Sequence, residues 1–277
     1  MIPAPPAPAC CMPTSSDIDI PTLLLAAGRG ERMRPLTDHT PKPLLPVRGK
    51  PLLQWRMEAL LRGGFQRAVL NTAWLGEQIE AHFGPTFSSP HDSAQPLQLR
   101  YSREGRDFGQ ALETAGGICR ALPDLGEVFW AMAGDVFAPD FVFSQQQVQA
   151  FVASPHLAHI WLVPNPTHNP QGDFGLDTER GLAVNRAAGS SAARYTFSTI
   201  ALYRRALFQP PWCDIPAGNP GGVRAALAPL LRAAMAQQRV SAALYTGDWT
   251  DVGTPERLAE LNARTHPPTL QPPQETL

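Results

Sequence analysis

A short apolar run, Thr22-Leu-Leu-Leu-Ala-Ala27, ends abruptly at Gly28-Arg29-Gly30. Such a run is typical of a strand that is buried on both faces, as in the middle of a parallel sheet. Residues 28–50 then hold glycine, arginine and several prolines, a composition that predicts a long loop. A loop of this length inside a domain is usually functional, so the end of this strand is the first place to look for a site.

The alternation of an apolar run with an amphipathic stretch continues along the chain. Strands are predicted at residues 67–72, 97–101, 128–133 and 157–163, and helices at 51–62, 74–83 and 111–122. This order predicts an α/β protein with a Rossmann-like, mostly parallel sheet, right-handed crossovers and helices on both faces. A hairpin at 172–186 and a β-rich segment at 194–203 predict a small mixed β extension, followed by helices near 229–238 and from Pro255.

Composition sets the limits of this domain and excludes several classes of protein. Of the 277 residues, 43% are hydrophobic and the formal net charge is −1, so a nucleic-acid-binding footprint is absent. No apolar run has the ~20 residues that a membrane span requires. Cys10, Cys11, Cys119 and Cys213 lack zinc-site spacing, and we expect a cytoplasmic protein, monomeric or a small homo-oligomer. Residues 1–20 are predicted to be a disordered Pro-rich tail, 21–264 one domain and 265–277 a loose tail.

The predicted loop has the composition of a phosphate-binding segment. Small residues let a backbone approach a ligand closely, and cationic side chains neutralise a polyphosphate. The loop is neither a Walker loop, since no Gly-Lys-Ser/Thr follows, nor the dinucleotide fingerprint, since Met33 stands where a third glycine is needed. The alternative is an ordinary turn with a solvated basic surface. The small residues are Ala26, Ala27, Gly28 and Gly30, and the cations are Arg29, Arg32, Arg34 and Lys42.

The ordered motifs of the chain resemble those of the sugar-1-phosphate nucleotidylyltransferases. The matching signature is Gly28-x-Gly30-x-Arg32-Met33-x-Pro35-Leu36-Thr37 with Pro41-Lys42-Pro43, and segments 71–75, 112–117, 134–136, 172–174, 196–198 and 249–254 extend the similarity to about Asn262. Enzymes of this family make nucleotide sugars from a nucleoside triphosphate and a sugar-1-phosphate. Within the family, the set is most similar to the branch that joins UTP to N-acetylmuramate 1-phosphate in cell-wall sugar recycling. Mannose- or glucose-1-phosphate as the substrate, or a non-catalytic nucleotide-sugar-binding protein, are the alternatives.

The resemblance also implies a role for individual residues. It implies that Arg34 and Lys42 act on the phosphates and that Asp135 and Asp251 hold Mg²⁺, the cofactor expected with carboxylates and substrate phosphates. Taken alone, either aspartate is as well explained as a turn or cap residue, and Asn71 as a turn cap. The implied nucleotide-binding residues are Ala26, Ala27, Gly28, Gly30, Glu31, Arg32, Gly105, Thr114 and Gly116, and the implied sugar-binding residues are Asn71, Asn165 and Asp173.

The expected chemistry requires no dedicated nucleophile in the protein. The attacking sugar phosphate has a second pKa near ~6 and is already ionised at neutral pH, so positioning and charge neutralisation are sufficient. One position departs from the family pattern, because Ala133 stands where the related branch has an asparagine before Gly134-Asp135. This departure predicts an altered contact with the sugar.

Overall fold

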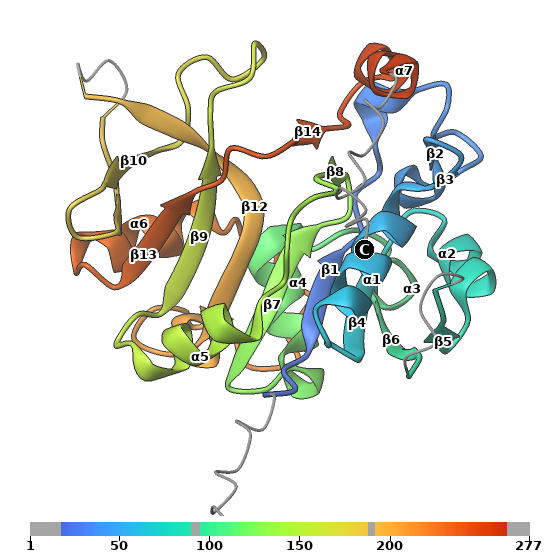
Figure 1. Cartoon of the computed structure of the whole chain (residues 1–277). Helices are drawn as coiled ribbons and strands as arrows, with labels where there is room; N and C mark the ends of the chain where they lie inside the picture. Colours follow the sequence, from blue (N-terminus) through green and yellow to red (C-terminus); the bar gives the residue numbers. More distant parts are fainter. Residues whose placement is uncertain (1–17, 90–94, 188–191, 265–277) are drawn as a thin grey trace, which may run out of the picture.

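The strand that begins at Thr22 lies in the middle of the molecule, as the sequence predicts. In the computed structural model, which describes residues 18–89, 95–187 and 192–264, β1 (Thr22–Leu25) lies between β4 (Arg67–Thr72) and β7 (Val128–Ala133), parallel to both (Figure 1). Leu25 is in register with Asn71 on one side and with Ala133 on the other. The carboxyl ends of three neighbouring strands therefore share one edge, which is where open α/β sheets bind ligands.

The sheet as a whole is mixed, and the predicted mostly parallel arrangement is not confirmed. Ten strands of the described chain form it in the order β10-β11-β13-β9-β12-β7-β1-β4-β6-β5. The block β7-β1-β4-β6 is parallel, whereas β12 runs antiparallel to both β7 and β9. The remaining strands are β5 (Thr86–Phe87), β6 (Leu97–Arg103), β9 (Ala158–Val163), β10 (Phe174–Asp177), β11 (Leu182–Val184), β12 (Arg194–Arg204) and β13 (Val240–Leu244).

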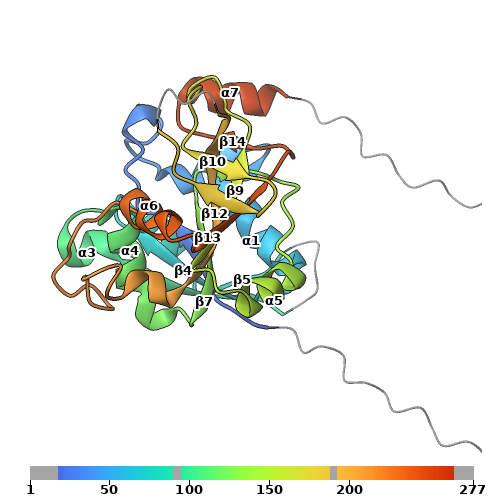
Figure 2. The same cartoon turned by 90° about the vertical axis from the view of Figure 1, so that its left-hand side faces the viewer.

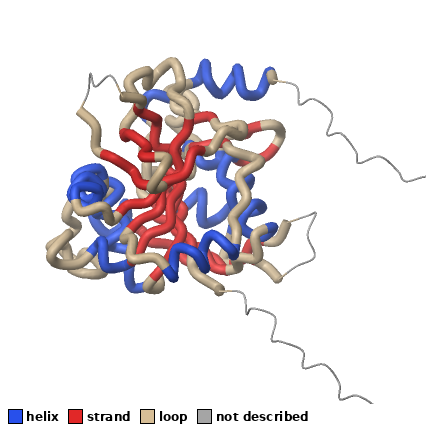
Figure 3. Tube along the Cα trace, turned by 60° about the vertical axis from the view of Figure 1, so that its left-hand side comes forward, coloured by secondary structure: helices blue, strands red, loops and turns tan. Residues whose placement is uncertain are grey.

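Helices cover both faces of the sheet, as predicted. The sheet separates the core into two large clusters, one on each face. Adjacent residues of β1 point to opposite faces, so Leu23 packs in one cluster and Leu24 in the other. Figure 2 shows α4 and α6 on one side of the strands and α1 and α5 on the other, and Figure 3 shows the strands, in red, as a central layer between helices. The helices are α1 (Leu52–Arg62), α2 (Gly76–Phe83), α3 (Glu104–Phe108), α4 (Glu113–Ala121), α5 (Gln145–Ala153), α6 (Ala228–Ala236) and α7 (Pro255–Ala263).

A two-stranded ladder outside the main sheet joins two distant parts of the chain. In it β8 (Val136–Phe137) pairs antiparallel with β14 (Thr250–Asp251), and Val136 is in register with Asp251. The buried Arg56 of α1 lies beneath this ladder and donates to the carbonyls of Val136 and Ala138 at 3.0 Å each. A second small ladder consists of β2 (Pro46–Val47) and β3 (Lys50–Pro51).

The last residues of the predicted N-terminal tail contact the folded domain. Residues 18–20 were expected in the tail, but Ile20 is buried in the core and Asp19 accepts a 2.7 Å hydrogen bond from Arg67. The rest of the predicted tails, residues 1–17 and 265–277, lies outside the described residues. None of the helices in the described ranges is long and apolar enough to cross a membrane.

Candidate active site

A cavity with two connected halves opens at the carboxyl edge of β1 and β7. The smaller half has a volume of about 230 Å³ and the larger half about 510 Å³. Both halves are lined by Leu25, Glu113, Thr114 and Ala133, so they form one continuous depression. Two ligands that react with each other could lie in it end to end.

The smaller half brings the predicted strand-end residues together with two charged side chains. Ala26, Ala27 and Gly28 line it next to Lys42 and Asp135. The Lys42 ammonium donates to a carboxylate oxygen of Asp135 at 2.8 Å, although the residues are 93 positions apart. The Lys42 side chain is only 9% exposed, whereas that of Asp135 is 39% exposed and faces the cavity opening. Gly28 has free space where a Cβ would stand, so the backbone here is open to a ligand.

A buried carboxylate fixes the strand ends around this half. Glu104 is fully buried and accepts hydrogen bonds of 2.7 Å from the Asn71 amide and from the backbone N–H of Leu112. Asn71 in turn accepts a 2.7 Å bond from the N–H of Ala26. Burial raises the pKa of the Glu104 carboxyl above its ordinary value, and the two donated hydrogen bonds oppose that shift. Asn71 lines the cavity as predicted, but its hydrogen bonds are those of a positioning residue.

Two of the predicted nucleotide-binding glycines are required by packing within the protein. A Cβ on Gly116 would lie 2.4 Å from the carbonyl oxygen of Val223, and one on Gly105 would lie 2.5 Å from the carbonyl oxygen of Ala73. Neither glycine lines the cavity. Gly105 borders a separate hollow beside α2. Thr114, at the start of α4, does line both halves of the cavity.

The arginines of the predicted phosphate loop lie outside the cavity. Arg34 has a half-exposed side chain that pairs with Asp38 at 3.2 Å, and Arg29 lies 3.6 Å from the centre of the Trp74 ring. Glu31 and Arg32 are exposed on a 3-10 turn that follows Gly30, which has the left-handed φ of 68°. Binding of a phosphate by Arg34 therefore stays a prediction that requires its side chain to leave Asp38.

Asp251 reaches the neighbourhood of Asp135 through the β8–β14 ladder. The N–H of Val252 donates to the backbone carbonyl of Asp135 at 2.9 Å, which joins the two acidic segments directly. The Asp251 carboxylate pairs with Arg257 at 2.8 Å and lies 3.3 Å from the His168 ring nitrogen. Within the described chain no cluster of three or more His, Cys, Asp or Glu side chains could hold a metal ion. A divalent cation here would have two protein carboxylates and would take its other ligands from substrate and water, a donor set that suits Mg²⁺.

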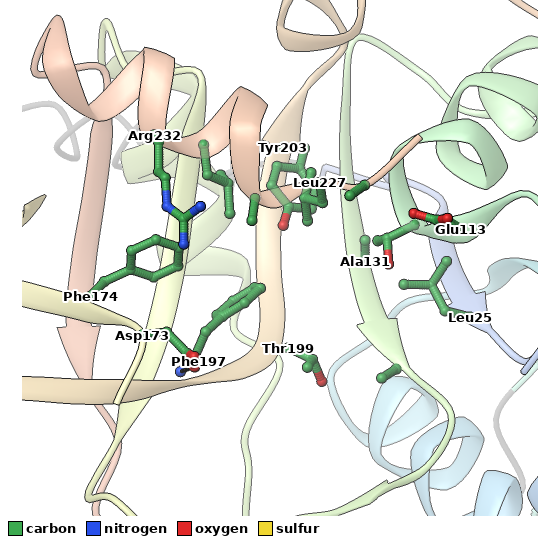
Figure 4. Close-up of a pocket in the computed structure, with 15 residues that line it drawn as sticks. Leu25, Glu113, Ala131, Asp173, Phe174, Phe197, Thr199, Tyr203, Leu227 and Arg232 are labelled. Atoms are coloured by element: carbon green, nitrogen blue, oxygen red, sulfur yellow. Dashed lines mark hydrogen bonds between the residues drawn. The ribbon is translucent and has the colours of Figure 1, made fainter. Parts of the chain in front are cut away.

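The larger half of the cavity has an apolar lining with a few polar groups (Figure 4). Asp173 lines it as predicted, and its carboxylate accepts a 2.8 Å bond from the N–H of Phe197. Asn165 does not line it, because its amide bonds to the carbonyls of Pro170 and Arg194 and to the Thr196 hydroxyl. Asn165 therefore connects the 164–173 segment to β12, which is a structural role.

Thr199 has a strained backbone conformation in this half. It lies at the irregularity where β12 shifts register against β9, and its φ of 68° is rare for a β-branched residue. Its hydroxyl is buried without a hydrogen-bond partner, although the residue lines the cavity. Such strain concentrates at functional sites, where a ligand supplies the missing contact.

Several residues that line the cavity or support its walls could not be found from the sequence. Glu104 and Arg56 have no local signal, because their partners come from distant segments. Thr199 lies in what reads as a regular strand, and Arg232 in what reads as the solvent face of a helix.

Comparison with known proteins decides the family. Residues 21–178 match the family described as Nucleotidyl transferase. The chain belongs to this family. Of the curated relatives of this nucleotidyl transferase, the N-acetylmuramate alpha-1-phosphate uridylyltransferase of Neisseria meningitidis is 45% identical over 243 residues, which cover 87% of the present chain and 96% of that protein. The UTP–glucose-1-phosphate uridylyltransferase of Synechocystis is 34% identical over 41% of the chain and 30% of that protein.

The solved structures agree on the fold of this nucleotidyl transferase. The UDP-glucose pyrophosphorylase from Acinetobacter baumanii superposes with a TM-score of 0.67 and 15% identity, covering 88% of the present chain and 92% of that one. The resemblance to sugar-1-phosphate nucleotidyltransferases is thus confirmed.

Proposed function

We propose that this nucleotidyl transferase joins UTP to N-acetylmuramate 1-phosphate and releases pyrophosphate. The similarity to the Neisseria meningitidis enzyme carries this proposal, because it extends over nearly the whole of both chains at 45% identity. The cavity supports it, since one continuous depression offers a half with a cation and a carboxylate and a half with an apolar lining for a sugar. Glucose- or mannose-1-phosphate is the second candidate, favoured by relatives that match less of the chain.

The bond-forming step would take place where the two halves of the cavity meet. A sugar phosphate oxygen, already ionised at neutral pH, attacks the α-phosphorus of the triphosphate, and pyrophosphate leaves with the electron pair of the broken P–O bond. Lys42, held in a fixed position by burial, provides a positive charge to the phosphates at this point. The open backbone at Ala27 and Gly28 would let the triphosphate approach β1 closely.

Asp135 and Asp251 are the residues that would hold Mg²⁺ in this proposal. When bound, the ion supplies charge neutralisation at the phosphates and helps to align them. Each carboxylate already pairs with a cation, Asp135 with Lys42 and Asp251 with Arg257. These two cations hold the acidic pair in place on neighbouring backbone segments. Retention of the pair also argues against a purely binding protein, which would not require it.

The decisive experiment is a turnover screen of the four nucleoside triphosphates against a panel of sugar-1-phosphates, with pyrophosphate release as the readout. We expect the highest kcat/KM for UTP with N-acetylmuramate 1-phosphate. A preference for glucose- or mannose-1-phosphate would replace the substrate assignment. Binding of a nucleotide sugar by calorimetry without any pyrophosphate release would identify a non-catalytic protein.

The metal assignment has its own test. Asp135→Asn should lower kcat by at least two orders of magnitude, because the neutral amide is a poor ligand for Mg²⁺ and a poor partner for Lys42. Asp177→Asn on the β10–β11 hairpin is the matched control, since this aspartate lies outside both halves of the cavity. Equal turnover of the two variants, at saturating Mg²⁺ and with unchanged melting temperature, would remove Asp135 from the metal site.

A further inference from the structure

Arg232 on α6 is an arginine at the cavity that has no partner in the described chain. No hydrogen bond or ion pair involves its side chain within those residues, although it lines the larger half of the cavity. The other cations near the site are occupied: Lys42 pairs with Asp135, Arg257 with Asp251, and Arg224 with Glu113 at 3.1 Å. Arg232 is therefore the one unpaired cation that this part of the described structure presents to a ligand.

Arg232 lies at the end of the larger half that is remote from Lys42. Figure 4 shows the guanidinium directed from α6 toward the ring of Phe174, at the opposite end from Leu25 and Glu113. Leu25 and Glu113 belong to both halves of the cavity, so they mark the side on which Lys42 lies. A sugar whose C1 phosphate lies near Lys42 would direct its C3 and C4 substituents toward Arg232.

The nearby carboxylate of Asp173 does not pair with Arg232, so the guanidinium is available to bind an anion. Asp173 lines the same half, but its carboxylate oxygens accept from the Phe197 N–H at 2.8 Å and from the Asn169 amide at 3.3 Å. The remaining lining near α6 is apolar, with Phe174, Leu227 and Leu231. An arginine beside an aromatic ring and aliphatic side chains is suited to a planar carboxylate on a partly apolar stem, because its donors form a fork that matches two oxygens.

We propose that Arg232 is a specificity-determining residue that binds a carboxylate carried by the sugar on the side remote from C1. This inference rests on the proposed function, in which the sugar is N-acetylmuramate 1-phosphate. That sugar differs from N-acetylglucosamine 1-phosphate only in a lactyl ether on O3, which has a methyl group and a carboxylate. Arg232 recognises the carboxylate, and the neighbouring apolar side chains accommodate the methyl group. Neutral hexose phosphates offer Arg232 no charged partner.

The two sugars form a matched substrate pair for the test. For each we would measure kcat and KM with UTP, in the wild type, Arg232→Gln and Arg232→Lys. Loss of a charge-assisted hydrogen bond should lower kcat/KM for N-acetylmuramate 1-phosphate by about 10- to 100-fold, with most of the change in KM. The value for N-acetylglucosamine 1-phosphate should change little, so the ratio between the sugars falls. Arg232→Lys should recover part of the ratio, since it restores the charge without the fork.

Arg100→Gln is the control for charge, because Arg100 has an exposed side chain on β6 that pairs with Asp124. It removes the same charge from the protein and should leave the ratio unchanged. Calorimetric titration with the two free sugars, N-acetylmuramate and N-acetylglucosamine, gives a second readout that requires no turnover, and only the former should bind more weakly to Arg232→Gln.

The outcomes separate the inference from the proposed function. A wild type that prefers N-acetylmuramate 1-phosphate, together with an unchanged ratio in Arg232→Gln, overturns the inference and leaves the proposed function intact. A wild type that does not use N-acetylmuramate 1-phosphate overturns both. A fall of the ratio in Arg232→Gln but not in Arg100→Gln supports both.

Discussion

Replacing the buried Arg56 by methionine should destabilise the protein and impair the site at the same time. The Arg56 side chain, only 1% exposed, donates to the carbonyls of Val136 and Ala138. Burial lowers its pKa to about 10, and the nearby Tyr245 and Asp135 oppose this shift, so the guanidinium stays charged at neutral pH. Methionine fills a similar volume but leaves the Val136 carbonyl without a donor, and the Ala138 carbonyl keeps only the 3.3 Å bond from the Phe141 N–H.

The expected magnitude follows from those two carbonyls. The orphaned Val136 carbonyl costs about 1–3 kcal/mol and the bond lost at Ala138 about 1 kcal/mol, which gives a loss of about 3 kcal/mol in the free energy of unfolding. For a domain of this size each kcal/mol corresponds to about 2–4 °C, and the melting temperature should fall by about 10 °C. Because the same carbonyls fix β8, kcat should also fall at temperatures where the variant is fully folded.

Arg62→Met provides a control on the same helix. Arg62 is exposed and makes a single 3.4 Å bond to the Pro139 carbonyl, so its replacement should change the melting temperature by no more than a degree or two. Thermal unfolding followed by circular dichroism, with kcat measured well below the transition, compares the two variants directly. If Arg56→Met melted and turned over like Arg62→Met, the reasoning about the carbonyls of β8 would be refuted.

Three further changes test other parts of the site. The pKa of Glu104 is raised by burial, so the folded state keeps this proton to higher pH than the unfolded state, whose value lies near the ordinary 4.5. The stability of the wild type relative to Glu104→Gln should therefore decrease as the pH rises from about 4.5 through the folded pKa, as measured by denaturant unfolding at several pH values; a difference that increases with pH would contradict the assignment. Gly116→Ala should lower the melting temperature because the new Cβ would lie 2.4 Å from the Val223 carbonyl oxygen. Gly28→Ala should leave the melting temperature unchanged and raise KM for the triphosphate. Identical unfolding curves for the two variants would show that the contact between α4 and Val223 adapts freely. Ala133→Asn adds an amide where the two halves of the cavity meet. The ratio of kcat/KM for N-acetylmuramate 1-phosphate to kcat/KM for glucose 1-phosphate should rise by about three- to tenfold. A constant ratio in a folded variant would mean that position 133 does not contact the sugar.

The parallel half of the fold could be read from the sequence because its signals are local. Strands at 67–72 and 128–133 are observed at the predicted residues, since their apolar runs end at clear turn signals. The position of β12 between β7 and β9 could not be read, because it runs antiparallel to both and no local pattern shows which strands become neighbours. The strand β13 and the helix α5 were not predicted, since the short alanine-rich VSAAL stretch and the glutamine-rich start of α5 have weak patterns.

The candidate site shows the same division between local and distant information. The strand-end residues Ala26 to Gly28 and the pairing partners Lys42 and Asp135 are where the motifs predict them, at one edge of the sheet. A glycine in a motif does not reveal whether a ligand or the protein itself requires the missing side chain, and Gly116 proved to pack on Val223. Orientation is likewise absent from the sequence, which could not show that Arg34 pairs with Asp38 or that the Asn165 amide donates to the Arg194 carbonyl.

β14 leaves the ribosome long after β8, the strand with which it pairs. β1, β4, β7 and Lys42 emerge earlier and can assemble the parallel block, yet Asp251 can pair beside Val136 only after more than a hundred further residues have been synthesised. The wall of the larger half, α6 with Arg232, also arrives late. A prematurely terminated chain would therefore form part of the sheet without completing the site, and incomplete translation products would not consume nucleoside triphosphate.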